Sequence, residues 1–254
     1  MADGGQALQA VTLKVMRPAF KALWRMRVSG LDNIPADGGA IICGNHTAVI
    51  DSFFLPIVAP RPVSFVGKAE YMDDWKTSKL FPALGMIPID RSGGDSAQAA
   101  LDAAAGVLES GNLFGIYPEG TRSRSGFLHK GHTGAARLAV RTGCPIIPVG
   151  IKGARRIQPP DQFLPHVFRP LEVSFGKPIY PAASDAISDQ RLRLRQMTDE
   201  VMFEIRELSG QDYVNEYANK PAAAVASAPA PAPIPEPEMP PRRSSADVLK
   251  PIPA

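Results

Sequence analysis

The chain reads Ala40-Ile41-Ile42-Cys43-Gly44-Asn45-His46-Thr47-Ala48-Val49-Ile50-Asp51 where an apolar run gives way to a loop. The apolar residues that open this stretch predict a buried β-strand. A histidine and a carboxylate, five positions apart, follow that strand directly. Loops at strand ends usually carry the functional groups of α/β folds, so His46 and Asp51 are the first candidates for a site.

A histidine and an aspartate at this spacing can form a general base. A carboxylate that accepts a hydrogen bond from imidazole Nδ1 fixes the tautomer and leaves Nε2 free to take a proton from a hydroxyl. The G-x-S-x-G elbow of serine esterases occurs nowhere in the 254 residues, so the attacking hydroxyl would belong to the substrate. The spacing alone leaves open that His46 is only a turn or helix-start residue.

A second strand-like run, 113–117, leads into a loop that reads Pro118-Glu119-Gly120-Thr121-Arg122-Ser123-Arg124-Ser125-Gly126. Arginine forks match phosphate oxygens, and glycine lets backbone N–H groups approach an anion. The loop is therefore typical of an anion site. A solvated turn with an ordinary surface ion pair is the alternative for such a loop.

Two further motifs complete an ordered series. They are Gly85-Met86-Ile87-Pro88-Ile89-Asp90-Arg91 and Cys144-Pro145-Ile146-Ile147-Pro148-Val149-Gly150. The order His-x4-Asp, G-M-I-P-I-D-R, Y-P-E-G-T-R-S, P-I-I-P-V resembles the four sequence blocks of the glycerolipid acyltransferases, most closely the 1-acylglycerol-3-phosphate (lysophosphatidate) acyltransferases. The resemblance runs from about residue 30 to residue 176.

The resemblance implies a role for each matching residue. His46 would be the general base and Asp51 its orienting partner. The glycerol phosphate headgroup would be held by five residues, namely Arg91, Glu119, Gly120, Thr121 and Arg122. Glu119 has the same charge sign as phosphate, so we expect it to orient an arginine or to accept from a glycerol hydroxyl. Residues 145–149 would shape the acyl-donor side, and Tyr117 stands where the family usually has phenylalanine.

The implied reaction moves a fatty acyl group from an acyl thioester to the free sn-2 hydroxyl of lysophosphatidate and gives phosphatidate. The co-substrate would be acyl-CoA or acyl-acyl carrier protein, with no other cofactor and no metal. One alternative is another acceptor, either glycerol 3-phosphate or another lysophospholipid. A different alternative is a non-catalytic, lipid-binding membrane adaptor. Cys43 could in principle accept an acyl group, although a buried inert thiol is the simpler interpretation.

Apolar runs that alternate with helical patterns predict an α/β fold, a central mixed sheet flanked by helices. The expected strands are 40–44, 63–67, 113–117, 146–151 and 171–175, and the expected helices are 96–109, 133–142 and 188–208. We assign residues 30–218 to this acyltransferase-type domain. Residues 219–254 predict a disordered Pro/Ala-rich tail, because ten of the 26 prolines of the chain fall within 221–254.

Residues 1–29 predict a membrane-associating segment. Residues 11–27 hold five basic side chains and no acidic one, and Lys14, Arg17, Lys21 and Arg25 are spaced to share one helical face that Pro18 would interrupt or kink. Such a segment suits an anionic membrane surface, whereas a helix packed on the domain with a solvated basic face is the alternative.

Net charge and hydropathy argue against several other classes of protein. A net charge of only +3 argues against a nucleic-acid binder. We find no apolar run of about 18 residues, as a spanning helix needs, and no secretion signal. Two cysteines favour a reducing compartment. We therefore expect a protein that lies peripherally on the cytoplasmic face of the cell membrane.

Overall fold

The computed structural model describes residues 2–68, 84–89, 96–162, 164–181 and 189–218. Within these residues the main sheet has seven strands, in the order β1-β8-β7-β2-β5-β3-β4. These strands are β1 (Arg25–Ser29), β2 (Ala40–Gly44), β3 (Val63–Lys68), β4 (Met86–Ile89), β5 (Leu113–Ile116), β7 (Ile146–Lys152) and β8 (Pro170–Phe175). All neighbouring pairs are parallel except β7 and β8, which makes the sheet mixed as predicted.

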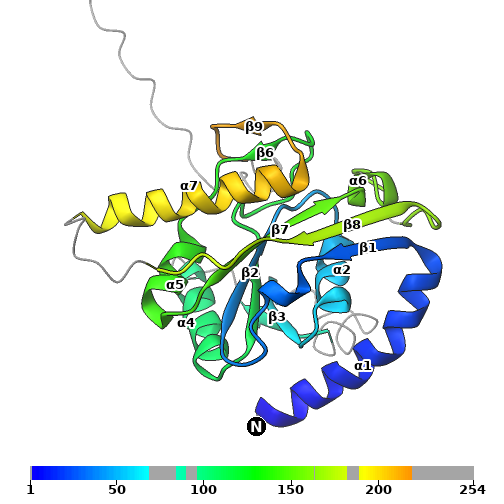
Figure 1. Cartoon of the computed structure of the whole chain (residues 1–254), viewed down its shortest axis with the longest axis horizontal. Coiled ribbons are helices and arrows are strands. Elements are labelled where there is room, and N and C mark those ends of the chain that lie inside the picture. The colour runs from blue at the N-terminus through cyan, green and yellow to red at the C-terminus, as the bar shows by residue number, and fades with distance from the viewer. Residues whose placement is uncertain (1, 69–83, 90–95, 163, 182–188, 219–254) are drawn as a thin grey trace, which may run out of the picture. The chain divides into compact units, whose positions relative to one another are not determined.

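Helices cover both faces of this sheet (Figure 1). They are α1 (Ala2–Leu23), α2 (Asp51–Val58), α4 (Ser96–Glu109), α5 (Gly134–Thr142), α6 (Ala154–Ile157) and α7 (Gln190–Ser209). A short second sheet pairs β6 (Leu128–His129) with β9 (Tyr213–Val214). The predicted α/β class with a central mixed sheet flanked by helices is confirmed.

Alternate side chains of β2 divide the core into two clusters. Ile42 faces the cluster that contains Phe54 and Leu55 of α2. Ile41 and Cys43 face the other cluster, to which α4, α5 and α7 contribute Leu108, Leu138 and Ile205. All five residues of β2 are buried, because helices pack on both sides of this central strand. The strand is thus a rigid base for the loop that follows it.

The N-terminal region differs from the sequence prediction. The helix passes through Pro18 but ends at Leu23, and Arg25 and Arg27 lie on strand β1, in parallel register with β8. The prediction that Arg25 shares a helical face with the other cations is wrong. A period of 3.6 in the basic residues could not reveal that the backbone of 25–29 pairs with a strand about 145 positions later.

Arg17 also turns inward, away from the expected basic face. Its Nε donates to the carbonyl oxygen of Ile57 at 2.9 Å, and an Nη donates to that of Ala59, both at the C-terminal end of α2. Leu13 is buried against Ile57, which packs α1 on α2. None of the helices within the described residues combines the length and the apolar character that crossing a membrane requires. The proposed tail, 219–254, lies outside the described residues.

Candidate active site

The site begins where β2 ends, at the carboxyl edge of the sheet. Asn45 is fully buried there, and its amide forms two hydrogen bonds with the backbone of Ile151 on β7, Nδ2 to O at 3.0 Å and N to Oδ1 at 2.8 Å. Its Nδ2 also donates to Gln211 Oε1 at 2.7 Å. The clamp fixes the loop that presents His46. Nothing in the sequence indicates these contacts beyond the position of Asn45 beside the histidine.

The structure brings His46 and Asp51 together. His46 Nδ1 lies 3.1 Å from Asp51 Oδ2, and the same oxygen accepts from the backbone N–H groups of Thr47 at 2.7 Å and Ala48 at 2.8 Å. Asp51 is the first residue of α2 and is completely buried, whereas the His46 side chain is 14% exposed. A carboxylate partner at Nδ1 sets the tautomer in which Nε2 is an acceptor. The predicted pair is formed, while its catalytic role stays a prediction.

Tyr117 covers one face of the histidine. The two rings stack with centroids 3.9 Å apart and planes 10° from parallel. The Tyr117 hydroxyl is buried beside Ser52 without a hydrogen bond of ordinary geometry among the described residues. Burial and the nearby Asp51 carboxylate raise the pKa of Tyr117 well above its usual value, so the phenol stays neutral. A neutral aromatic face stabilises an adjacent imidazolium by a cation–π contact.

Glu119 lies behind the histidine and is 1% exposed. Its two carboxylate oxygens accept from the backbone N–H of His46 at 3.2 Å and from that of His129 at 3.0 Å. Burial raises its pKa from 4.5 to about 7. Among the described residues, no arginine is hydrogen-bonded to it. One backbone donor on each carboxylate oxygen holds the loops of His46 and His129 together, which gives Glu119 a positioning role. Its predicted contact with the acceptor stays a prediction.

The rest of the loop after β5 lies beside His46. The backbone N–H of Ser123 donates to the His46 carbonyl oxygen at 2.7 Å. Gly120 turns the chain with a φ of 71°, and its N–H donates to the Tyr117 carbonyl oxygen at 3.0 Å. Thr121 is half-buried and Arg122 is exposed, so both are accessible to a ligand. The remaining predicted headgroup residue, Arg91, lies outside the described residues.

The fourth sequence block lies along the central strand. Residues 146–149 form the buried first part of β7, and they run in parallel register with β2 from Ile41 to Gly44. Val149 is therefore level with the end of β2 that leads into His46, and Ile151, which the Asn45 side chain holds, lies two residues further on. The role of 145–149 on the acyl-donor side stays a prediction.

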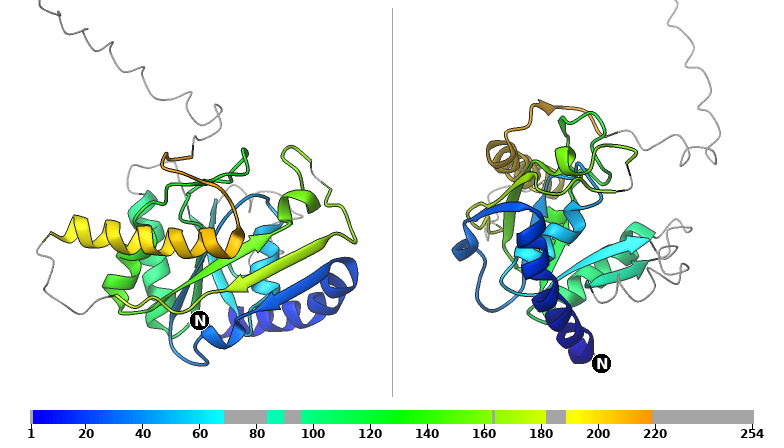
Figure 2. Two further views of the ribbon diagram at one scale, coloured as in Figure 1. Left: turned by 45° about the horizontal axis from the view of Figure 1, so that its top comes forward. Right: turned by 90° about the vertical axis from the view of Figure 1, so that its right-hand side faces the viewer.

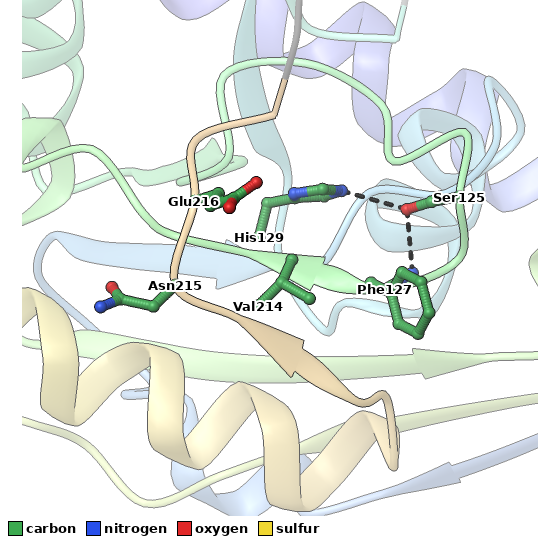
Figure 3. Close-up of a pocket in the computed structure, with 6 residues that line it drawn as sticks. All are labelled: Ser125, Phe127, His129, Val214, Asn215 and Glu216. Atoms are coloured by element: carbon green, nitrogen blue, oxygen red, sulfur yellow. Dashed lines mark hydrogen bonds between the residues drawn. The ribbon is translucent and has the colours of Figure 1, made fainter.

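Three other side chains with chemical potential, Cys43, His129 and His132, lie in different surroundings. The Cys43 thiol is fully buried, and burial raises its pKa far above the usual range, which removes it as an acyl acceptor. His129 Nε2 is directed at Ser125 Oγ, 3.1 Å away, in a cavity of about 440 Å³ that Glu216 also lines (Figure 3). His132 stacks instead on Tyr217. The two histidines thus have different side-chain partners.

Comparison with known proteins settles the family. Residues 25–152, half of the chain, match the family model described as Acyltransferase. The chain belongs to the acyltransferase family. This acyltransferase is 32% identical, over 53% of its length and 56% of the relative's, to the 1-acyl-sn-glycerol-3-phosphate acyltransferase of Borreliella burgdorferi. It is 22% identical, over 73% of its length and 89% of the relative's, to the protein of the same name from Bacillus subtilis.

The fold of this acyltransferase is also found among solved structures. The 1-acyl-sn-glycerophosphate acyltransferase PlsC from Thermotoga maritima superposes with a TM-score of 0.63 at 24% identity, covering 79% of this chain and 80% of that one. The predicted resemblance to the glycerolipid acyltransferases is confirmed at the level of family and fold. The acyltransferase spans about half the length of the first curated relatives that it matches, 56% and 48% of their chains.

Proposed function

We propose that this acyltransferase transfers a fatty acyl group from an acyl thioester to the sn-2 hydroxyl of lysophosphatidate and forms phosphatidate. The observation that carries the proposal is the His46–Asp51 pair, 3.1 Å apart, at the end of the central strand and beside the arginine-bearing loop. Relatives from two bacteria carry the name of this activity. The acyl donor would be acyl-CoA or acyl-acyl carrier protein.

In this mechanism His46 Nε2 removes the proton of the acceptor hydroxyl while the hydroxyl oxygen attacks the thioester carbonyl carbon. The negative charge of Asp51 and the ring of Tyr117 both favour the imidazolium that forms. The tetrahedral intermediate then collapses, the carbon–sulfur bond breaks, and the imidazolium returns its proton to the leaving thiolate. Exposed Arg122, with Thr121 and Gly120 beside it, would hold the acceptor phosphate.

The acceptor and product are lipids, so we further propose that the protein lies peripherally on the anionic, cytoplasmic face of the cell membrane. Helix α1 exposes Val11 at 61% and Val15 at 70%, and Lys14 and Lys21 are exposed on the same helix. Apolar and basic side chains on one helix suit the headgroup region of an anionic bilayer. Replacing both lysines with glutamate should strongly weaken binding to anionic vesicles without unfolding the protein.

The deciding experiment incubates the purified protein with lysophosphatidate and acyl-CoA, then with acyl-acyl carrier protein, and follows thiol release and the lipid product. His46→Ala should lower turnover by about a hundred- to ten-thousand-fold, the usual contribution of a positioned general base, with an unchanged melting temperature. Retained activity in this variant would refute the role of His46.

The alternatives have outcomes of their own in the same assay. Product with glycerol 3-phosphate or with another lysophospholipid, but not with lysophosphatidate, would identify a different acceptor. Absence of product with every acceptor and both donors would favour the lipid-binding adaptor.

A further inference from the structure

The loop between α6 and β8, residues 158–169, displays apolar side chains to solvent. Leu164 is 74% exposed, Val167 is 43% exposed and Phe168 is 64% exposed. Single exposed apolar residues are common on protein surfaces, but three within five positions form a patch that indicates a contact. Figure 1 and Figure 2 show this loop at the same end of the molecule as the junction of α1 and β1.

Hydrogen bonds fix the loop to that junction. The backbone N–H of Phe168 donates to the Leu23 carbonyl oxygen at 2.6 Å, and Trp24 Nε1 donates to the His166 carbonyl oxygen at 2.9 Å. The backbone N–H of Arg25 donates to the Arg169 carbonyl oxygen at 3.2 Å. Leu23 is itself 37% exposed, so the patch continues from the loop onto the end of α1.

The backbone of Phe168 is unusual for an aromatic residue. Its φ is 59°, in the left-handed region that a bulky side chain rarely adopts and that glycine adopts at no cost. A bulky side chain at this position therefore costs backbone strain, and at 64% exposure the ring packs on little of the described protein.

The charged side chains around the patch indicate the kind of partner that it would contact. Lys21, Arg25, Arg27 and Arg169 are all exposed at or next to the junction. The nearest acidic residues of the same elements have cationic neighbours: Asp161 pairs with Arg124, and Glu172 is in register with Arg27. An apolar patch within an excess of cations fits the headgroup region of an anionic bilayer, where aromatic and leucine side chains insert and arginines meet lipid phosphates.

We infer that Leu164, Val167 and Phe168 insert into the surface of an anionic membrane as a second contact beside α1. The start of the same loop is held by the active site: Gln158 Oε1 accepts from the Ile50 backbone N–H at 2.9 Å, and Asp161 pairs with Arg124 of the loop after β5. Insertion would thus place the site next to the bilayer interface where a lipid acceptor lies. This inference rests on the proposed membrane association but not on the reaction.

The test measures sedimentation of the full chain with phosphatidylglycerol vesicles. Phe168→Gly relieves the left-handed conformation, so its melting temperature should equal or exceed that of the parent protein while its vesicle affinity falls. Combined with Leu164→Ser, the loss should reach about tenfold or more, since several CH₂ groups leave the bilayer. Phe203→Ser is the matched control, because Phe203 is 55% exposed on α7, and it should bind like the parent protein.

A second readout keeps the test independent of affinity. Phe168→Trp should show a blue shift of tryptophan emission on addition of phosphatidylglycerol vesicles, relative to the parent protein, and none with phosphatidylcholine vesicles. The inference is overturned if Phe168→Gly/Leu164→Ser binds vesicles as the parent does, or if Phe168→Trp shows no shift. It is also overturned if the patch instead mediates self-association that the double variant abolishes in sedimentation velocity. Turnover of detergent-dispersed acceptor should be unchanged by the double variant, which separates this result from any failure of the proposed reaction.

Discussion

Glu119 carries a pKa of about 7, raised from 4.5 chiefly by burial. The folded protein keeps a proton on this residue that the unfolded chain releases between these two values, so its contribution to stability is present below about pH 4.5 and is lost as the pH rises through about 7. Glu119→Gln does not ionise. We therefore expect its free energy of unfolding to fall less over this window, by on the order of 2 to 3 kcal/mol, in urea denaturation at about pH 5 and about pH 8. Identical pH dependence in both proteins would contradict the burial argument.

Tyr117 offers a test of the stacked ring. Tyr117→Phe keeps the aromatic face and removes a buried hydroxyl that lacks a hydrogen bond of ordinary geometry, so turnover should stay close to that of the parent and stability should be equal or higher by about 1 kcal/mol. Tyr117→Leu removes the face that favours the imidazolium, so its kcat should fall below that of Tyr117→Phe. Equal kcat in the two variants would show that the ring only fills space.

Arg122 and Arg124 form a matched pair two positions apart in the loop after β5. Arg124 is paired with Asp161, whereas Arg122 is exposed beside the histidine loop. Arg122→Ala should raise the KM for lysophosphatidate about tenfold or more with a smaller change in kcat, because a charge-assisted phosphate contact is lost. Arg124→Ala should leave that KM nearly unchanged. If the two variants behave alike, Arg122 has no special role with the phosphate.

These residues also show what the sequence can and cannot predict about a site. The five-residue spacing of His46 and Asp51 is local, so the pair was predictable from the chain alone. The partners of Glu119 belong to segments 73 and 10 positions away, and only the folded sheet brings their N–H groups to one carboxylate. The role of Asn45 depends in the same way on β7, which is 106 positions distant.

At the scale of elements, period and composition predicted the buried strands well and the N-terminal junction poorly. The 96–109 helix has the bounds of α4, and the predicted strand 40–44 has those of β2. Strand β1 was missed because it lies on the edge of the sheet, where Arg25 and Arg27 stay solvated and continue the basic pattern of the helix before them. An edge strand carries no buried apolar run to mark it.

The contact between α1 and α2 gives a prediction at this scale. Arg17 donates to two carbonyl groups at the C-terminal end of α2, where a cation also meets the negative end of the helix dipole. Arg17→Ala should lower the free energy of unfolding by about 1 to 3 kcal/mol in urea denaturation. Lys14→Ala, on the exposed part of the same helix, should leave stability unchanged and weaken vesicle binding. A stable Arg17→Ala protein would show that the contact contributes little.

At the scale of the whole molecule, a net charge of +3 is modest, and the proposed membrane contact depends on where the cations lie. Exposed lysines on α1 and exposed arginines at the α1–β1 junction and on the loop before β8 attract anionic lipid over about one Debye length, roughly 10 Å at 0.1 M salt. Binding to phosphatidylglycerol vesicles should therefore weaken steeply between about 0.05 and about 0.5 M NaCl. Binding that ignores salt would assign the contact to the apolar side chains alone.

The pairing of β1 with β8 has a consequence for the order in which the protein is assembled. Arg25 is in register with Pro170, so the edge of the sheet cannot close until about 145 further residues have been synthesised. Contacts between residues so distant in the chain form late, because closing the long loop between them costs conformational entropy before the contacts can stabilise the fold. During translation α1 leaves the ribosome well before the strand that holds its end. In the proposed membrane association, the nascent chain would present this basic helix to a bilayer before the site around His46 is complete.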